Sequence, residues 1–191
     1  MRNYEILSGY TLNTPYENEI KFLIESLKKF NFSCDHIVPY KNQGTWEKNC
    51  QYKAIIIKEK LKELKKPVVW LDADAVIVKN PILFENIKED MASCQWYGGL
   101  ISGTLYFKNN EKINEVINEW IELNEQNPKE WDQKTLTRVA KNKEISIKIL
   151  PLSYCKIDYF KTKNAFIMQN QASRRFKRII NNAGINGKKS T

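Results

Sequence analysis

Hydrophobic and polar residues alternate along this chain with two distinct periods, which divide it into predicted helices and strands. Apolar residues at helical spacing mark residues 14–30, 46–64, 109–122 and 128–140. Apolar runs or two-residue alternation mark strands at 4–11, 35–39, 92–97, 100–107, 145–150 and 165–168, and the apolar run 68–78 contains a further strand that ends in Asp72-Ala73-Asp74. Because strands and helices alternate in this order, we predict an α/β fold.

The two ends of the predicted domain carry local signals. In Thr14-Pro15-Tyr16-Glu17, Thr14 is the expected N-cap, Pro15 the first helical residue and Glu17 the acid of a capping box. The composition beyond Ile180 is polar and rich in Asn, Gly and Lys, which indicates a frayed end. We therefore predict one domain over residues 1–180 and a flexible basic tail over 181–191.

Composition sets the broad class of the protein. The 191 residues are 42% hydrophobic and 28% charged, as expected of a soluble globular protein, and no apolar segment approaches the length of a membrane span. The start of the chain lacks the apolar core of a secretory signal. The four cysteines are scattered without a Cys-x-x-Cys pair, so we expect reduced thiols and a cytoplasmic protein.

Positive charge is concentrated near the C-terminus. Residues 156–191 contain nine Lys or Arg and one Asp, a net charge of +8 out of the +9 of the whole chain. The densest part, residues 173–178, is either a solvated segment able to bind a polyanion or a site where Arg174 or Arg175 holds a phosphate-bearing ligand. Nucleic acid is a candidate partner but is not favoured, because Phe176 is the only aromatic residue within this dense part.

The central apolar run, residues 68–78, contains two carboxylates, Asp72 and Asp74. An ionised Asp in apolar surroundings is costly unless it is paired, hydrogen-bonded or bound to a cation, and no basic residue lies between Pro67 and Val78. A divalent metal at the carboxyl end of a strand is the favoured interpretation. The alternative is an Asx turn whose acids are merely solvated.

Two further residues have both a functional and a structural interpretation. Trp46, at the start of a predicted helix, is either a lid or stacking residue or an anchor of that helix against the core. Gly103, inside a predicted strand, indicates a β-bulge or a close approach of a ligand to the backbone, with the bulge preferred.

The same Asp-x-Asp segment also fits the first motif of haloacid-dehalogenase-like phosphatases, in which the first Asp is a nucleophile and the second a general acid. That function requires a later pair of acidic residues for Mg²⁺. After Asp132 only Glu144 and Asp158 remain, and they are isolated. The phosphatase is therefore the less favoured enzyme.

Several landmarks occur together in a set order: residues 11–16 after the first strand, 44–46 before a helix that carries Lys53, 70–74, 102–107, Trp120, 131–133 and 171–175. In this arrangement the chain resembles the GT-A glycosyltransferases, most closely the nucleotide-diphospho-sugar transferase type, over nearly its whole length. The resemblance implies a single GT-A domain with a mixed central sheet. It also implies a nucleotide-sugar donor, usually a uridine diphosphate (UDP) sugar, bound through Mn²⁺ or Mg²⁺.

The resemblance also assigns roles to individual residues. Asp74 ligates the metal, while Asp72 contacts the ribose or reaches the metal through water. Thr11, Tyr16 and Lys53 would lie near the base and ribose, and Ser102 and Gly103 would line the sugar. The concentration of basic residues after 165–168 separately predicts that Arg174 or Arg175 contacts the diphosphate. Asp132 and Gln133 reach the sugar or the acceptor from a later helix, as candidate catalytic residues.

One position departs from the family pattern. Gln169 stands where such enzymes commonly offer a histidine to the metal, and an amide oxygen is a neutral, weaker ligand. A catalytically silent nucleotide-sugar-binding protein is therefore a third hypothesis. The resemblance leaves open the sugar, the acceptor (a glycan, a protein or a modified nucleobase), the stereochemical outcome and the oligomeric state.

Overall fold

The computed structural model describes residues 2–162 and 164–186, which form a central sheet covered on both faces. The six strands lie in the order β2-β1-β3-β6-β5-β7. Strand β1 is parallel to β2 and β3, β6 is antiparallel to β3 and β5, and β7 is parallel to β5. The predicted mixed sheet is thus confirmed, with strands β1 (Glu5–Thr11), β2 (Ile37–Tyr40), β3 (Val68–Leu71), β5 (Met91–Trp96), β6 (Gly99–Phe107) and β7 (Ile147–Leu150).

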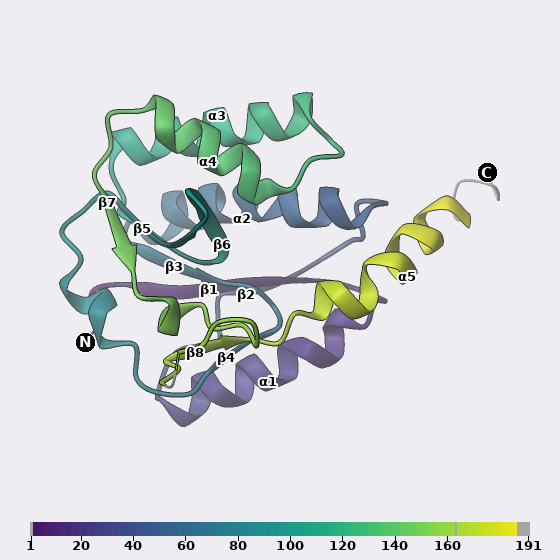
Figure 1. Ribbon diagram of the computed structural model, residues 1–191, viewed down its shortest axis with the longest axis horizontal. Helices are drawn as coiled ribbons and strands as arrows, with labels where there is room; N and C mark the ends of the chain where they lie inside the picture. The colour runs from purple at the N-terminus through teal and green to yellow at the C-terminus, as the bar shows by residue number, and fades with distance from the viewer. Residues whose placement is uncertain (1, 163, 187–191) are drawn as a thin grey trace.

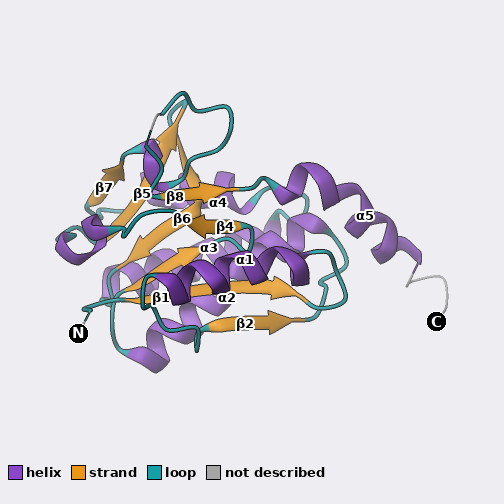
Figure 2. Cartoon of the chain, turned by 90° about the horizontal axis from the view of Figure 1, so that it is seen from below, coloured by secondary structure: helices purple, strands orange, loops and turns teal. Residues whose placement is uncertain are grey.

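Helices cover the two faces unequally (Figures 1 and 2). One face carries α2 (Trp46–Leu64), α3 (Glu111–Gln126) and α4 (Asp132–Asn142). The other carries α1 (Tyr16–Lys29) and a two-stranded ribbon of β4 (Ala75–Ile77) and β8 (Ile167–Gln169). Two 3-10 turns, η1 (Ile82–Asn86) and η2 (Leu152–Tyr154), and the last helix, α5 (Ala172–Asn186), complete the chain.

Each face of the sheet has its own hydrophobic core, because side chains alternate between the faces of every strand. On β3, Val68 and Trp70 pack with the helices α2 to α4, while Val69 and Leu71 pack on the side of α1. Trp120 of α3 is fully buried in the first core. This packing holds the carboxyl end of β3 between the two layers.

The predicted cap of α3 is confirmed, whereas that of α1 is wrong, because the N-cap of α1 is Pro15 and not Thr14. Helix α1 begins at Tyr16 rather than at Pro15, and the Thr14 hydroxyl accepts the backbone N–H of Tyr16 at 3.3 Å. The Glu17 carboxylate accepts the backbone N–H of Asn13, not that of Thr14, so the predicted capping box is displaced by one residue. Helix α3 is capped by the side chain of Asn110, which is one of the two residues, Asn109 and Asn110, that the sequence offers as its cap.

The apolar run over residues 68–78 holds two strands, and the first ends just before Asp72-Ala73-Asp74, close to the strand end that the sequence predicted. The chain turns at residues 72–75, where the carbonyl of Asp72 accepts the N–H of Ala75 at 2.9 Å. Strand β3 ends at Leu71, and β4 leaves the main sheet to pair with β8. An apolar run is also what two short buried strands produce, so periodicity did not reveal the turn.

The C-terminal region also differs from the prediction. Residues 172–186 form α5, which was not predicted. The flexible basic tail over 181–191 remains a prediction. Residues 187–191 of the predicted tail lie outside the described residues. Helix α4 begins at Asp132, not at 128, and β7 and β8 each begin two residues later than predicted. The 1–180 domain boundary remains a prediction.

The expected bulge at Gly103 is present. Between Ser93 and Cys94 of β5 the pairing partner on β6 jumps from Leu105 to Ile101, which leaves residues 102–104 of β6 unpaired with β5. A Cβ atom at Gly103 would lie 3.2 Å from the Gln169 side chain and 3.3 Å from the Cys155 sulfur. The glycine therefore also permits close packing of β8 and its neighbouring loop.

All four cysteines are free thiols, as predicted, with Cys94 and Cys155 buried and Cys34 and Cys50 half-buried. In the described part of the chain, no helix has the length and apolar character that crossing a membrane requires.

Candidate active site

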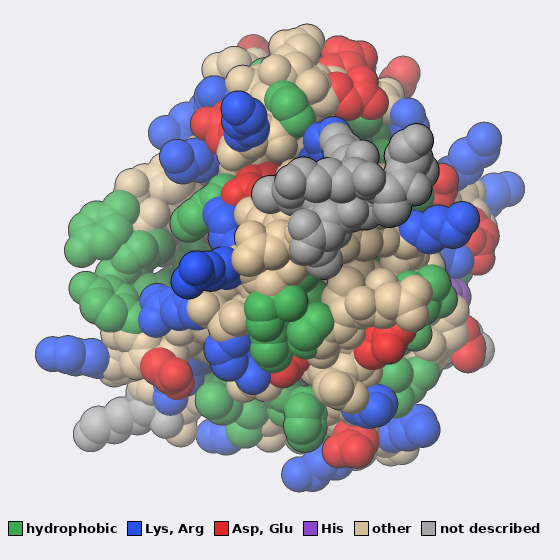
Figure 3. Space-filling model, turned by 90° about the vertical axis from the view of Figure 1, so that its right-hand side faces the viewer, with side chains coloured by type: hydrophobic (Ala, Val, Ile, Leu, Met, Phe, Trp, Pro, Cys, Tyr) green, Lys and Arg blue, Asp and Glu red, His purple; other side chains and the backbone are tan. Residues whose placement is uncertain are grey.

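A cleft with about 560 Å³ of free volume, part of it open to solvent, lies at the carboxyl ends of β1 and β3. Figure 3 views this end of the molecule. One wall is aromatic, with Tyr16, Tyr40 and Trp46, and the floor contains the two carboxylates. Its lining residues are Gly9, Tyr10, Thr11, Tyr16, Tyr40, Trp46, Asn49, Cys50, Lys53, Trp70, Asp72, Ala73, Asp74 and Ser173.

The turn after β3 presents the two carboxylates in different surroundings. The Asp72 side chain is 36% exposed, and its Oδ1 accepts both the indole N–H of Trp70 and the ammonium of Lys53 at 2.8 Å. No donor among the described residues reaches its Oδ2. Asp74 is buried, and its Oδ2 accepts the backbone N–H of Ala172 at 2.7 Å. Asp74 therefore sits at the N-terminus of α5, where the helix dipole favours negative charge.

Asp74 is nevertheless a destabilised carboxylate. Burial, and after it the negative charge of Asp72, raise the pKa of Asp74 to about 6, and the hydrogen bond from Ala172 opposes that rise. At neutral pH the cleft thus holds a mostly ionised, partly uncompensated carboxylate. A cation close to Asp74 would favour the ionised form of this carboxylate.

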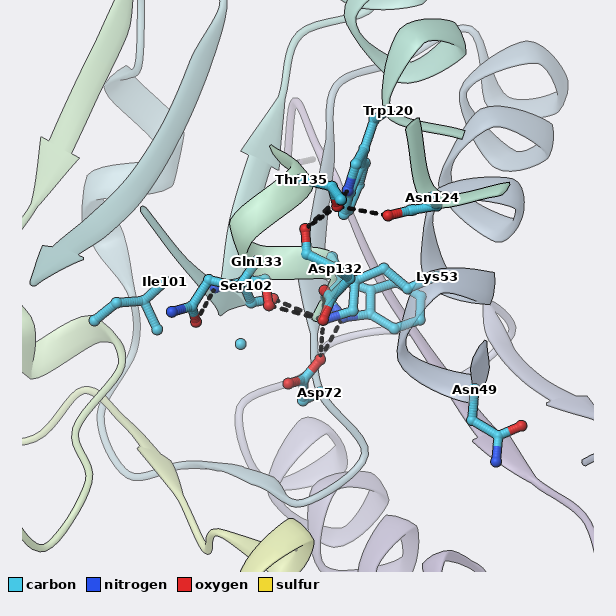
Figure 4. A network of polar contacts seen from close by, with 12 residues as sticks. Asn49, Lys53, Asp72, Ile101, Ser102, Trp120, Asn124, Asp132, Gln133 and Thr135 are labelled. Atoms are coloured by element: carbon cyan, nitrogen blue, oxygen red, sulfur yellow. Dashed lines mark hydrogen bonds and ion pairs between the residues drawn. The ribbon is translucent and has the colours of Figure 1, made fainter. Parts of the chain in front are cut away.

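Lys53 of α2 is the buried cation of the site (Figure 4). Its ammonium lies 2.8 Å from Asp72 Oδ1 and 3.0 Å from Asp132 Oδ2, and it donates to the Ser102 carbonyl at 3.0 Å. Burial alone lowers the pKa of Lys53, but the carboxylates of Asp132 and Asp72 outweigh it and raise that pKa above its usual range. The absence of a basic residue near Asp72 in sequence was therefore misleading, because its partner comes from another helix.

The first turn of α4 supplies Asp132 and Gln133 to the same network (Figure 4). Asp132 is 4% exposed, and burial raises its pKa while Lys53 opposes the rise. The Gln133 Oε1 accepts the backbone N–H of Ser102 at 3.3 Å. The indole N–H of Trp120 donates to the Asp132 carbonyl at 2.9 Å and so holds the start of α4 in place.

Gln169 lies beside the site without lining the cleft. On β8 it is paired with Ala75, the residue after Asp74. Its amide nitrogen donates to the Gly103 carbonyl at 2.9 Å and to the Thr104 hydroxyl at 3.1 Å. The Oε1 atom is buried and has no hydrogen-bond partner among the described residues.

Helix α5 crosses the mouth of the cleft. Its Lys177 pairs with Glu47 at 2.6 Å and lies 4.5 Å and 5.4 Å from the ring centres of Trp46 and Trp131. The Asn181 side chain accepts the backbone N–H of Trp46 at 2.7 Å. Trp46, whose indole N–H donates to the Tyr16 hydroxyl at 3.2 Å, thus both lines the cleft and anchors two helices.

The two candidate arginines differ in their contacts. Arg174 is exposed, whereas Arg175 donates to Glu19 at 3.0 Å, a carboxylate whose side chain is only 8% exposed. Arg175 and Lys177 are thus ion-paired within the protein, while Arg174 and Arg178 are exposed.

Residues 39–189 match the sequence profile described as nucleotide-diphospho-sugar transferase. The chain belongs to this family. The match spans most of the chain and includes the Asp72–Asp74 turn, Lys53, Asp132 and the start of α5. The protein is therefore a glycosyltransferase, and membership of this family excludes the haloacid-dehalogenase-like phosphatase.

Solved structures confirm the GT-A type of fold for this transferase. A glycosyltransferase involved in the glycosylation of the major capsid of PBCV-1 has 14% identity and a TM-score of 0.67, covering 95% of this chain and 98% of that one. GlyE of Streptococcus pneumoniae TIGR4 has 13% identity and a TM-score of 0.60, covering 98% and 64%. Mouse xyloside xylosyltransferase 1 has 10% identity and a TM-score of 0.59, covering 89% and 98%. No curated protein matches the chain.

The structure brings most of the predicted site residues of this transferase together. Thr11, Tyr16, Lys53, Asp72 and Asp74 line the cleft, and Ser102, Gly103, Asp132 and Gln133 adjoin it through the contacts above. Other lining residues were missed, among them Asn49 and Cys50, which share a signal with Trp46 and Lys53. Trp46, Asn49, Cys50 and Lys53 recur at three- and four-residue spacing, which places them on one face of α2.

Proposed function

We propose that this glycosyltransferase uses a UDP-sugar and binds it with Mn²⁺ or Mg²⁺ against Asp72 and Asp74. The observation that carries the proposal is the pair of carboxylates on the floor of a cleft with an aromatic wall. The aromatic wall suits a nucleobase, because planar bases stack on aromatic rings. By position, Thr11 and Tyr16 contact the base and ribose. The acceptor supplies a hydroxyl group.

The residues present fit a divalent cation. Asp72 Oδ2 carries no hydrogen bond from the described residues, and Asp74 is an ionised carboxylate beside it with a raised pKa. Across residues 2–162 and 164–186, no three His, Cys, Asp or Glu side chains converge. A site completed by the donor's own phosphates suits this set, because Mg²⁺ usually binds through one or two carboxylates plus substrate phosphates.

The reaction forms a bond from an acceptor oxygen to the anomeric carbon and breaks the bond from that carbon to the diphosphate, which leaves with the electron pair. A bound cation supplies positive charge beside the departing diphosphate. Ser102 and Gly103 line the sugar, and Gln133 has an amide nitrogen left to donate to it or to the acceptor. Asp132 is held by Lys53 as a fixed negative charge, so we propose that it orients rather than removes a proton.

The N-terminal part of α5 is the proposed diphosphate contact. Arg174 is exposed and already free of ion pairs with the described residues. Arg175 has to exchange Glu19 for a phosphate oxygen to take this role. A bidentate guanidinium contact suits phosphate geometry.

The proposal is tested by thermal unfolding with a panel of UDP-, GDP- and ADP-sugars, each with Mn²⁺ or with EDTA. We expect a UDP-sugar with Mn²⁺ to raise the melting temperature by about 5–10 °C at a hundredfold excess over the dissociation constant. Slow release of UDP should accompany binding, as water replaces the acceptor. Stabilisation without turnover would identify the catalytically silent protein, and no stabilisation by any member would refute the donor assignment.

Gln169 is proposed as a weak third metal ligand through its unpartnered Oε1. Replacing Gln169 by His should lower the Mn²⁺ concentration that gives half-maximal UDP release. One ring nitrogen can keep the hydrogen bond to the Gly103 carbonyl and leave the other for the metal, as metal-binding histidines do. Gln169→Leu is the control, since it removes the oxygen while keeping the bulk. An Mn²⁺ titration that is the same for wild type and Gln169→His would remove this residue from the site.

A further inference from the structure

We propose that Trp70 is a positioning residue, whose indole N–H holds the Asp72 carboxylate so that one oxygen remains directed to the ligand. The ligand in this inference is the one given by the proposed function, whereas the hydrogen bond between Trp70 and Asp72 is observed in the structure. The Trp70 Nε1 donates to Asp72 Oδ1 at 2.8 Å. The same oxygen accepts from Lys53, so both donors act on Oδ1 and neither acts on Oδ2.

The position of Trp70 two residues before Asp72 explains the contact. The backbone N–H of Asp72 donates to the Gly103 carbonyl at 3.0 Å, so the pairing of β3 with β6 continues one residue past the strand. Side chains at i and i+2 of an extended chain point to the same side, so the indole and the carboxylate emerge side by side. Trp70 is 3% exposed and lines the cleft, which fixes the ring between the sheet and α2. A carboxylate that is 36% exposed is thereby tied to a rigid element.

Two neighbours keep the indole in this place. A Cβ atom on Gly9 of β1 would lie 3.1 Å from the Trp70 ring and 2.8 Å from Ile56, so the ring occupies space that only glycine leaves open. The Lys53 ammonium lies 5.7 Å from the centre of the Trp70 ring. The indole therefore contacts Asp72 directly and borders the other donor that Asp72 uses.

Lys53 and Trp70 both contact Asp72 but differ in charge and in the number of carboxylates that they contact. Lys53 neutralises charge and is shared between Asp72 and Asp132. Trp70 is neutral, and among described side chains its N–H is given to Asp72 alone. Loss of the indole N–H should therefore free the Asp72 carboxylate to rotate without removing its counter-charge.

The test is Trp70→Phe, which keeps an aromatic ring but removes the N–H. We expect the Mn²⁺ concentration for half-maximal stabilisation by UDP to rise by about 10- to 100-fold, the usual effect of losing a group that orients a metal ligand. The affinity for UDP measured in EDTA should stay the same, which a general loss of packing would not allow. Trp96→Phe, the same change at a ring on the β5–β6 hairpin, should leave both quantities unchanged.

A second readout does not depend on the ligand. In a ¹⁵N correlation spectrum, the indole signal that disappears in Trp70→Phe should shift in Asp72→Ala, whereas the Trp96 indole signal should not. If Trp70→Phe fails to fold, Gly9→Ala should displace the ring and raise the Mn²⁺ requirement instead. An unmoved Trp70 signal in Asp72→Ala, or an unchanged Mn²⁺ requirement in Trp70→Phe, would overturn the positioning role. If UDP and Mn²⁺ do not stabilise the wild-type protein but the Trp70 signal shifts in Asp72→Ala, the proposed donor is refuted and the indole contact is established.

Discussion

Replacing Lys53 by Met is expected to destabilise the fold by about 3–5 kcal/mol and to abolish UDP release, because the substitution leaves a buried carboxylate without its counter-charge. Asp132 is 4% exposed and has the Lys53 ammonium at 3.0 Å. Asp72 would lose the same partner and keep only the Trp70 N–H at its Oδ1. Urea unfolding in EDTA measures the stability change without any ligand contribution.

Two control variants separate this effect from a general loss of a lysine. Lys58→Met changes an exposed residue of the same helix and should alter stability by no more than about 0.5 kcal/mol. The double variant Lys53→Met with Asp132→Asn should recover much of the lost stability, because it removes the uncompensated charge, while activity stays absent. A loss below about 1 kcal/mol for Lys53→Met alone would show that the buried network does not depend on this ammonium.

Replacing Asp74 by Asn is expected to abolish the Mn²⁺-dependent stabilisation by UDP and at the same time to stabilise the ligand-free protein. The raised pKa of about 6, against 3.8 in an ordinary Asp, means that the folded protein binds this proton more tightly than the unfolded chain does. The ionised side chain therefore opposes folding above about pH 6, by roughly 1–3 kcal/mol. That cost disappears as the pH falls through 6 toward 3.8.

Urea unfolding of wild type and Asp74→Asn in EDTA should thus differ at pH 8 and converge near pH 4. The Asn side-chain oxygen can still accept the N–H of Ala172, so the start of α5 should be retained. Ser173→Ala serves as a control next to this contact, and its pH dependence should follow that of wild type. The full Mn²⁺-dependent thermal shift in Asp74→Asn would exclude Asp74 as a metal ligand.

The two predictions describe opposite uses of buried charge in one site. Lys53 binds two carboxylates and so supports both the fold and the cleft. Asp74 is only partly compensated, by the N-terminus of α5, and costs stability in the absence of a cation. The proposed function accounts for such a carboxylate, because a binding site is selected for function rather than for stability.

The sequence alone determined the order of the main elements and the place of the carboxylates. Amphipathic spacing located α1, α2 and α3 because each helix buries one stripe against the sheet, and that requirement is visible in local periodicity. The Asn110 cap of α3 could be predicted locally for the same reason, since its capping bond joins residues only three positions apart. The Asp72–Asp74 pair stood out because charge inside an apolar run is costly.

Only the tertiary structure decided how these groups are held. The ion pairs of Lys53 join α2 to the end of β3 and to the start of α4, across separations that no local pattern records. The break between β3 and β4 depends on the pairing of β4 with β8, about 90 residues later. Helix α5 crosses the cleft through contacts with α1 and α2, and the free Oδ2 of Asp72 follows from where the Trp70 indole and the Lys53 ammonium meet. These features arise from packing between distant segments, and packing is a property of the folded chain rather than of any one stretch of it.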